Sequence, residues 1–120
     1  MAPPANQHAR TRVSGPHLVV EVRGEIDLAT APQVAEHLDA ATSAATASPD
    51  VLVDLRSVEF FDCSGLRVLC RAQTRAVRLG GRLRVVADQP ELRRLLRATG
   101  LLGRFPPLGS IPGESAPGTE

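Results

Sequence analysis

The sequence predicts an α/β domain in which parallel crossover connections follow an N-terminal hairpin. Two observations favour this class. The apolar run of residues 51–53, with Leu55 after Asp54, is typical of a strand buried on both faces. Strand patterns alternate with helix patterns from residue 17 onward, as in proteins with parallel strands. The 120 residues are enough for one domain with one core.

The N-terminal segment predicts a leader and a hairpin. Residues 1–7, which include two prolines, are expected to form a disordered leader. Strands are predicted over 8–13 and 17–23, and the turn signal Ser14-Gly15-Pro16 separates them. The two strands are expected to form an antiparallel hairpin at the start of the folded domain. This domain is expected to span residues 8–106.

A helix is predicted after the loop Gly24-Glu25-Ile26-Asp27. Thr30 is its expected N-cap, and Gln33 would complete a capping box with it. The spacing gives this helix one apolar face, made of Val34, Leu38, Ala41 and Ala45. Ser48-Pro49-Asp50 ends the helix and leads into the central strand.

The central stretch continues from the buried strand into a helix that begins near residue 64. A turn is expected after Leu55, in which Val58, Phe60 and Phe61 pack back onto the sheet. Asp62 or Ser64 can cap the helix that follows. Residues predicted to face the core are Leu66, Leu69, Cys70 and Val77. An arginine stripe at 67, 71, 75 and 78 predicts either a solvated face or a contact with an acidic partner.

The C-terminal third predicts one more strand and one more helix. A strand is expected over 82–87, and Asp88 or Gln89 caps the helix after it. The buried face of this helix is expected to comprise Leu92, Leu95, Leu96 and Thr99. Residues 102–105 are expected to be a short strand or an extended segment, and residues 107–120, rich in proline, glycine and serine, a disordered tail.

Composition excludes several classes of function. A net charge of +1 and 2% aromatic residues argue against a nucleic-acid binder. The two cysteines lie seven residues apart on one predicted helix, too far for a disulfide, which indicates free thiols in a reducing cytoplasm. No apolar stretch is long enough to span a membrane, and no signal peptide is recognised. The lack of lysine, with abundant alanine, suggests a bacterial source.

Candidate functional residues gather where predicted parallel strands end. Because such ends meet at one edge of a sheet, Asp27, Cys63 and Ser64 are expected to lie together. Cys63 is read as a small residue fitting a tight loop, as a redox-sensitive thiol, or as a nucleophile. No histidine is placed as its base, and no arginine follows at phosphatase spacing, so no enzyme is expected. A receiver-type magnesium site would need a lysine, and no phosphate loop or zinc spacing occurs, so no cofactor is expected.

Three groups of residues match one known pattern. They are Asp54-Leu55 with Val58, Phe60 and Asp62-Cys63-Ser64-Gly65-Leu66; Gly24-Glu25-Ile26-Asp27 with Thr30; and, more weakly, Thr99-Gly100-Leu101-Leu102. The pattern resembles the bacterial anti-sigma factor antagonists of the STAS domain family. The resemblance implies a single STAS domain with a mixed sheet of four to five strands and three to four helices mainly on one face.

The resemblance also implies a function. Such a protein binds an anti-sigma factor, typically a serine kinase of the histidine-kinase-like ATPase family, and releases a sigma factor. The residues expected to bind the partner are Asp27, Leu28, Thr30, Asp62, Cys63, Ser64, Gly65, Leu66 and Arg67. The alternative is a STAS subunit of a lipid-transport ATPase complex. The sequence does not indicate an oligomeric state.

One residue departs from the family pattern. Regulated members carry a phosphorylatable serine directly after the loop aspartate, where this chain has Cys63. Three possibilities follow: Ser64 is the acceptor instead, the partner is bound constitutively, or control is redox-based.

Overall fold

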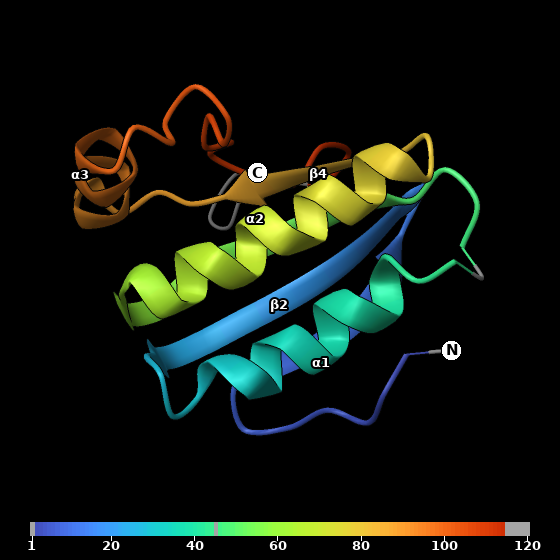
Figure 1. The fold of residues 1–120 in the computed structure, drawn as a ribbon, viewed down its shortest axis with the longest axis horizontal. Helices are drawn as coiled ribbons and strands as arrows, with labels where there is room; N and C mark the ends of the chain where they lie inside the picture. The colour runs from blue at the N-terminus through green and yellow to red at the C-terminus, as the bar shows by residue number, and fades with distance from the viewer. Residues whose placement is uncertain (1, 45, 115–120) are drawn as a thin grey trace.

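The computed structural model describes residues 2–44 and 46–114, which form a mixed four-stranded sheet (Figure 1). The strands, in spatial order, are Ala9–Ser14 (β1), His17–Ile26 (β2), Asp50–Phe61 (β3) and Arg82–Val86 (β4). β1 pairs with β2 in the antiparallel sense, whereas β2 with β3 and β3 with β4 are parallel pairs. The predicted hairpin and parallel crossovers are confirmed.

The helices are Ala31–Ala41 (α1), Cys63–Arg78 (α2) and Pro90–Ala98 (α3). α1 connects β2 to β3 and α2 connects β3 to β4, so both crossovers step across the sheet in the same direction. Right-handed crossovers of that kind place both helices on one face, and Figure 1 shows α1 and α2 side by side in front of the sheet. α3 follows β4 and lies at the end of the molecule.

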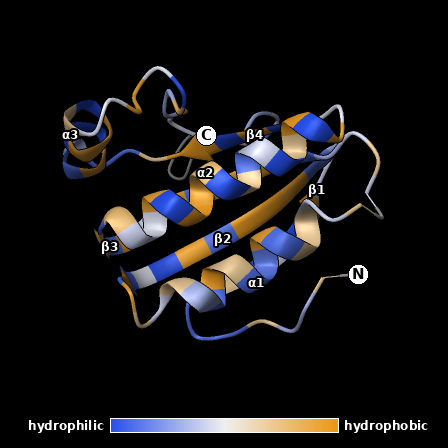
Figure 2. Ribbon diagram, in the orientation of Figure 1, coloured by the Kyte–Doolittle hydropathy of each residue, from blue (hydrophilic) through white to orange (hydrophobic). Residues whose placement is uncertain are grey.

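The main core lies between the sheet and these helices. All five residues from Val51 to Leu55 are buried, which confirms the central strand as buried on both faces. Alternate residues of β3 point to the helices, and Leu38 of α1 and Leu69 of α2 meet them there with 0% and 1% exposure. Figure 2 shows hydrophobic and hydrophilic bands alternating along α1 and α2, as expected of helices with one buried face.

The outer face of the sheet, which α1 and α2 do not cover, has a smaller core of its own. Val19, Leu52 and Val86 form an apolar cluster there, and Ile111 from the C-terminal segment packs on it with 1% exposure. Leu108 extends the sheet: its N–H donates to Val85 O, and its carbonyl accepts from Ala87 N, both at 2.9 Å.

This docking differs from the expected disorder of residues 107–120. Residues 107–114 are held because the outer face needs an apolar cover, which Ile111 supplies. Residues 115–120 lie outside the described residues. The folded domain therefore continues past residue 106, where it was expected to end.

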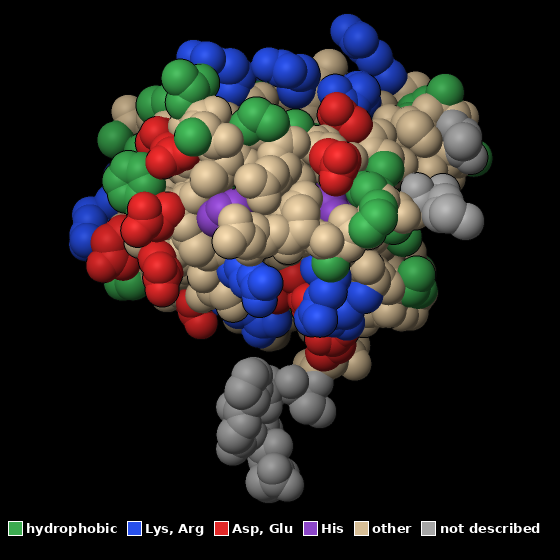
Figure 3. Space-filling view, turned by 90° about the horizontal axis from the view of Figure 1, so that it is seen from below, with side chains coloured by type: hydrophobic (Ala, Val, Ile, Leu, Met, Phe, Trp, Pro, Cys, Tyr) green, Lys and Arg blue, Asp and Glu red, His purple; other side chains and the backbone are tan. Residues whose placement is uncertain are grey.

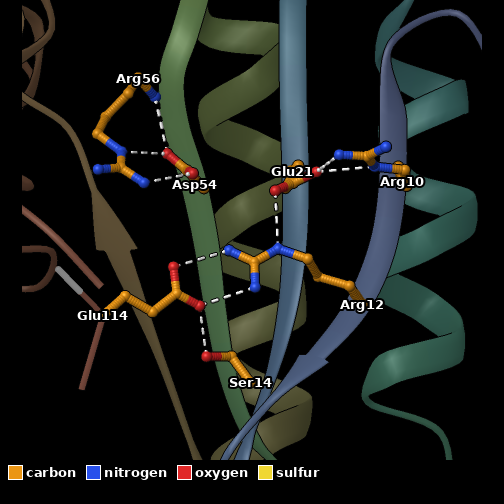
Figure 4. Close-up of polar contacts among 7 residues, drawn as sticks. All are labelled: Arg10, Arg12, Ser14, Glu21, Asp54, Arg56 and Glu114. Carbon is orange, nitrogen blue, oxygen red and sulfur yellow. Dashed lines mark hydrogen bonds and ion pairs between the residues drawn. The ribbon is translucent and has the colours of Figure 1, made fainter. Parts of the chain in front are cut away.

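Charged side chains contact one another on the outer face of the sheet (Figure 4). Arg12 donates to Glu21 at 2.8 Å and to both carboxylate oxygens of Glu114 at 2.7 and 3.0 Å. Hydrogen bonds from Arg12, and then from Ser14, lower the pKa of Glu114 from 4.5 to about 2. Beside them, Arg56 makes two 2.9 Å bonds to the carboxylate of the buried Asp54. Residues 107–114 are thus fixed to β1 through Glu114 and to the apolar cluster through Ile111.

The leader also departs from the expected disorder. Asn6 Oδ1 accepts the backbone N–H groups of His8 and Ala9 at 2.9 and 2.8 Å, and its amide donates to Gln33 O at 3.0 Å. His37 of α1, which is fully buried, has Pro4 O at 3.1 Å from Nε2. These contacts hold residues 2–7 against α1; Met1 lies outside the described residues.

Some element boundaries differ from the predicted ones. β3 does not turn after Leu55 but continues along β2 to Phe61, because two register shifts let its irregular end stay paired. α1 ends at Ala41, so the predicted face position Ala45 lies outside the helix and outside the described residues. Residues 102–105 form a turn instead of a strand.

Four predicted helix core positions are not buried as expected. Val77 is 62% exposed and Thr99 is also exposed, while Cys70 and Leu95 are only partly buried. The small residues Ala72 and Ala76 take the inward positions of α2 instead, with 0% exposure each. Among the helices of the described part of the chain, none is long and apolar enough to cross a membrane.

Candidate functional site

The parallel strands β2 and β3 end at the same edge of the sheet and bring two loops together. Ile26 pairs with Phe61, and the N–H of Asp62 donates to Ile26 O at 3.2 Å. We refer to Asp27–Thr30 and Asp62–Ser64 as the loop edge. The two sequence motifs therefore lie side by side, as their positions after parallel strands predict.

The first loop is closed by its own side chains. Asp27 Oδ1 accepts the N–H groups of Ala29 and Thr30 at 3.0 and 3.1 Å. Thr30 Oγ1 accepts the N–H of Asp27 at 2.9 Å and donates to Glu25 O at 2.7 Å. These bonds replace the predicted capping box, since the side chain of Thr30 makes no cap bond to α1. The tight loop leaves Leu28 pointing outward with 77% exposure.

The second loop is a helix start capped by Asp62. Its Oδ1 accepts the N–H of Ser64 at 2.8 Å, which confirms Asp62 as the N-cap of α2. Such caps contribute about 0.5–2 kcal/mol to stability. Cys63 is the first helical residue and is exposed, whereas Ser64 is half-buried.

Gly65 sets the shape of this loop. A Cβ atom at this position would lie 2.7 Å from Cε1 and from Cε2 of Phe61, closer than real side chains approach. The Phe61 ring therefore packs against the first turn of α2, and only glycine leaves room for it. This contact fixes the helix start relative to the end of β3.

The predicted partner-binding residues divide into two groups. Gly65 and Leu66 are buried, and Leu66, at 4% exposure, belongs to the main core, so its side chain is not available to a partner in this structure. The others keep exposed or half-buried positions: Asp27, Leu28, Thr30, Asp62, Cys63, Ser64 and Arg67. The residues of this second group lie in the two loops or, in the case of Arg67, in the first turns of α2.

Phe60 is an exposed residue at this edge that sequence reasoning placed wrongly. It is 52% exposed, although it was expected to pack onto the sheet. The sequence did contain a signal. Adjacent residues of a strand point to opposite faces, so Phe60 and Phe61 could not both pack into the same core. With Leu28, Phe60 is one of four large hydrophobic side chains exposed within the described residues; the other two are Val13 and Val77.

The loop edge is locally acidic, unlike the chain as a whole. Figure 3 shows acidic side chains gathered at the end of the molecule where β2 leads into α1. Glu25 and Glu59, both exposed, flank the half-buried Asp27 and Asp62 along the chain, and the nearest bases in the sequence are Arg23, Arg56 and Arg67. A partner that binds here would meet mainly carboxylates.

Each of the three histidines has a polar neighbour within the fold. His17 Nδ1 lies 3.2 Å from Asp50 at the opposite end of β3, and His37 Nδ1 lies 2.7 Å from Thr11 Oγ1. His8 Nδ1 lies 3.0 Å from Arg23 O.

Both cysteines are free thiols. Among residues 2–44 and 46–114, no group of three His, Cys, Asp or Glu side chains could hold a metal ion.

Known proteins share both the sequence pattern and the fold. The sequence model of the STAS domain matches residues 8–111. Anti-sigma-F factor antagonist RsfA, from two strains of Mycobacterium tuberculosis, is 29% identical over 83 residues. That match covers 69% of this chain and 65% of the relative, so it spans just under two thirds of the relative's length.

Solved structures extend the comparison. An anti-sigma factor antagonist from Mycobacterium paratuberculosis is 31% identical, with 92% of each chain covered and a TM-score of 0.77. An anti-sigma-factor antagonist (STAS) domain protein from Planctomyces limnophilus also superposes with a TM-score of 0.77, over 86% of this chain and 91% of that one, but at 21% identity it shows the fold alone. Together, the sequence match over most of the chain, the shared topology and the loop motifs establish that this chain belongs to the STAS domain family.

Proposed function

We propose that this chain is an anti-sigma factor antagonist whose loop edge binds an anti-sigma factor and thereby frees a sigma factor. The observation that carries the proposal is the adjacency of two rigid loops, of which one presents Leu28 with 77% exposure and the other starts α2 at Asp62. The 31% identical relative with an antagonist's name supports the same function. A partner with an apolar and basic surface would complement this edge.

The partner that we propose is a serine kinase of the histidine-kinase-like ATPase family. In regulated relatives, such a kinase phosphorylates the residue after the loop aspartate and adds about two negative charges to the interface. In this chain the exposed Cys63 occupies that position and offers no hydroxyl group. Ser64 is half-buried, and its N–H is bound by Asp62. We therefore propose that binding is constitutive with respect to ATP.

A pull-down tests both parts of the proposal. Wild-type chain and a Cys63→Ser variant are immobilised and offered each purified anti-sigma factor of this ATPase family encoded in the same genome, with and without Mg-ATP. The wild type is expected to retain one of them under both conditions. The variant is expected to bind without ATP, to release its partner with ATP, and to gain the mass of one phosphate.

The outcomes separate the two parts. If neither form captures any of these ATPases, the antagonist function is overturned, and co-purification of a lipid-transport ATPase would favour that other class of STAS protein. If ATP releases the wild type and a phosphate is found on Ser64, the antagonist function stands but constitutive binding is overturned.

A further inference from the structure

A groove lies next to the loop edge, between β3 and α3. β4 pairs with β3 only as far as Asp54, whereas β3 continues to Phe61 beside β2. Beyond Asp54, the helix α3 lies beside β3 where a strand would otherwise pair with it. The resulting hollow runs from Val58 on β3 to Ala98 on α3.

The floor of the groove is apolar and held in place. Val58 and Leu92 form it, with 7% and 6% exposure. Gln89 ties the start of α3 to the strand, because its amide donates to Leu55 O at 2.7 Å and to Val58 O at 3.0 Å. These two bonds occupy carbonyl groups that a neighbouring strand would otherwise bind. The groove is therefore preformed, which lowers the entropic cost of filling it.

Aromatic side chains border the groove on the side of the loop edge. The chain has three phenylalanines and no tryptophan or tyrosine. Phe105 is buried, and the other two, Phe60 and Phe61, line this groove. Phe61 is fixed against Gly65, while Phe60 stands 52% exposed. An exposed aromatic side chain beside an apolar floor is the kind of residue that dominates binding energy at interfaces.

The charges around the groove indicate what kind of side chain would enter it. Glu59 of β3 and Glu91 of α3 are exposed on its two sides, and among the described residues Arg94 is the one base that lines it. Neither glutamate forms an ion pair with residues 2–44 or 46–114. An apolar side chain with a basic neighbour would match both the floor and the rim.

We infer that this groove receives an apolar side chain of the anti-sigma factor, flanked by lysine or arginine. The inference rests on the proposed function and extends the same contact surface beyond the loop edge. Continuity supports it, because Phe60 and Phe61 lead directly into Asp62, so a partner seated on the loops reaches the groove without a gap.

A matched pair of variants tests the inference. Phe60→Ala and Val77→Ala each remove a side chain that is more than half exposed. Val77 lies near the C-terminal end of α2, whereas the loop edge is at the N-terminal end of this helix. Their affinities are measured by calorimetry with the anti-sigma factor captured by the wild type. Phe60→Ala is expected to weaken binding at least about tenfold, as for an interface anchor, and Val77→Ala to leave it unchanged. Unfolding curves check that both variants fold.

The charges are tested separately. A double variant, Glu59→Gln with Glu91→Gln, is expected to bind less tightly at low salt and to show a flatter dependence of affinity on salt than the wild type.

Distinct results would overturn the inference and the proposed function. If Phe60→Ala binds like the wild type while Leu28→Arg loses binding, the partner stops at the loop edge and the inference alone fails. An unchanged salt dependence in the double variant overturns the part of the inference that places lysine or arginine next to the apolar side chain of the partner. If the wild type binds none of the anti-sigma factors, the function and the inference fall together.

Discussion

The outer face of the sheet and the loop edge are both charged surfaces, but they use their charged and apolar groups differently. On the outer face, Arg12 binds Glu21 and Glu114, and Ile111 covers the apolar cluster. At the loop edge, Asp27 and Asp62 bind backbone N–H groups of their own loops, and Leu28 is left 77% exposed.

The difference separates stability from recognition. The outer face is completed by the chain itself, since its ion pairs and its apolar cover come from within residues 9–114. The loop edge is rigid but not covered, because its hydrogen bonds fix the backbone and leave side chains outside. A surface of the second kind is suited to a protein partner, whereas the first kind mainly holds the fold together.

The largest expected effect on stability comes from the tail. Ile111→Ala removes a side chain with 1% exposure and leaves a cavity over Leu52. We expect a loss of about 2–3 kcal/mol in the free energy of unfolding. Urea unfolding measures it. The control is Leu28→Ala, which removes an exposed side chain and is expected to be neutral. Equal effects of the two variants would show that the tail is not part of the fold.

A smaller effect is expected at Gly65. Alanine normally stabilises a helix by roughly 0.5–1 kcal/mol over glycine, but the new Cβ would lie only 2.7 Å from two carbons of the Phe61 ring. Overpacking costs about 1–3 kcal/mol, so the clash outweighs the helix preference. We expect Gly65→Ala to lower the thermal midpoint and to weaken partner binding. Gly103→Ala, which has open space around its Cβ position, is the control. A stabilised Gly65→Ala variant would contradict the packing described for the loop edge.

Most of the fold could be predicted because its signals are local. The alternation of short apolar strands with amphipathic helices, and the buried run Val51–Leu55, define the sheet without any knowledge of distant contacts. The family pattern around Asp62 likewise lies within a few residues. The cap at Asp62 and the adjacency of the two loops follow directly from this pattern.

The features that could not be predicted depend on contacts between distant residues. Residues 107–114 have a composition typical of disorder, and only the position of Val19 and Leu52 on an uncovered face explains why Ile111 docks. Similarly, the leader is held against α1 by one hydrogen bond from Asn6 to Gln33 O and one contact between His37 and Pro4 O. The groove beside Phe60 exists because β4 stops before β3 does, which no local pattern encodes.

The pH dependence of stability gives the smallest expected effect and concerns the outer face. The pKa of Glu114 is lowered from 4.5 to about 2, mainly by Arg12. A lowered pKa in the folded state means that the contribution to stability is present above about pH 4.5 and is lost as the pH falls toward 2. We expect Arg12→Gln to remove the part of this acid sensitivity that comes from Glu114, whereas Arg10→Gln, which removes a contact to Glu21 and not to Glu114, should keep that part.

Urea unfolding at a series of pH values from neutral to acid, for the wild type and both variants, measures this difference. The same acid sensitivity in all three proteins would mean that the pair of Arg12 and Glu114 does not contribute to stability. It would leave Ile111 as the contact that holds the tail.

The central claim, that the loop edge binds an anti-sigma factor, is tested most directly by one matched pair of substitutions. Leu28 and Val13 are 77% and 71% exposed, but Leu28 lies on the loop edge and Val13 on β1 at the opposite end of the sheet. The affinities of wild type, Leu28→Arg and Val13→Arg for the captured anti-sigma factor are compared. We predict that Leu28→Arg weakens binding by about 30-fold or more, as at an interface hot spot, and that Val13→Arg binds like the wild type. Equal affinities of the two variants would contradict the assignment of the loop edge as the binding surface.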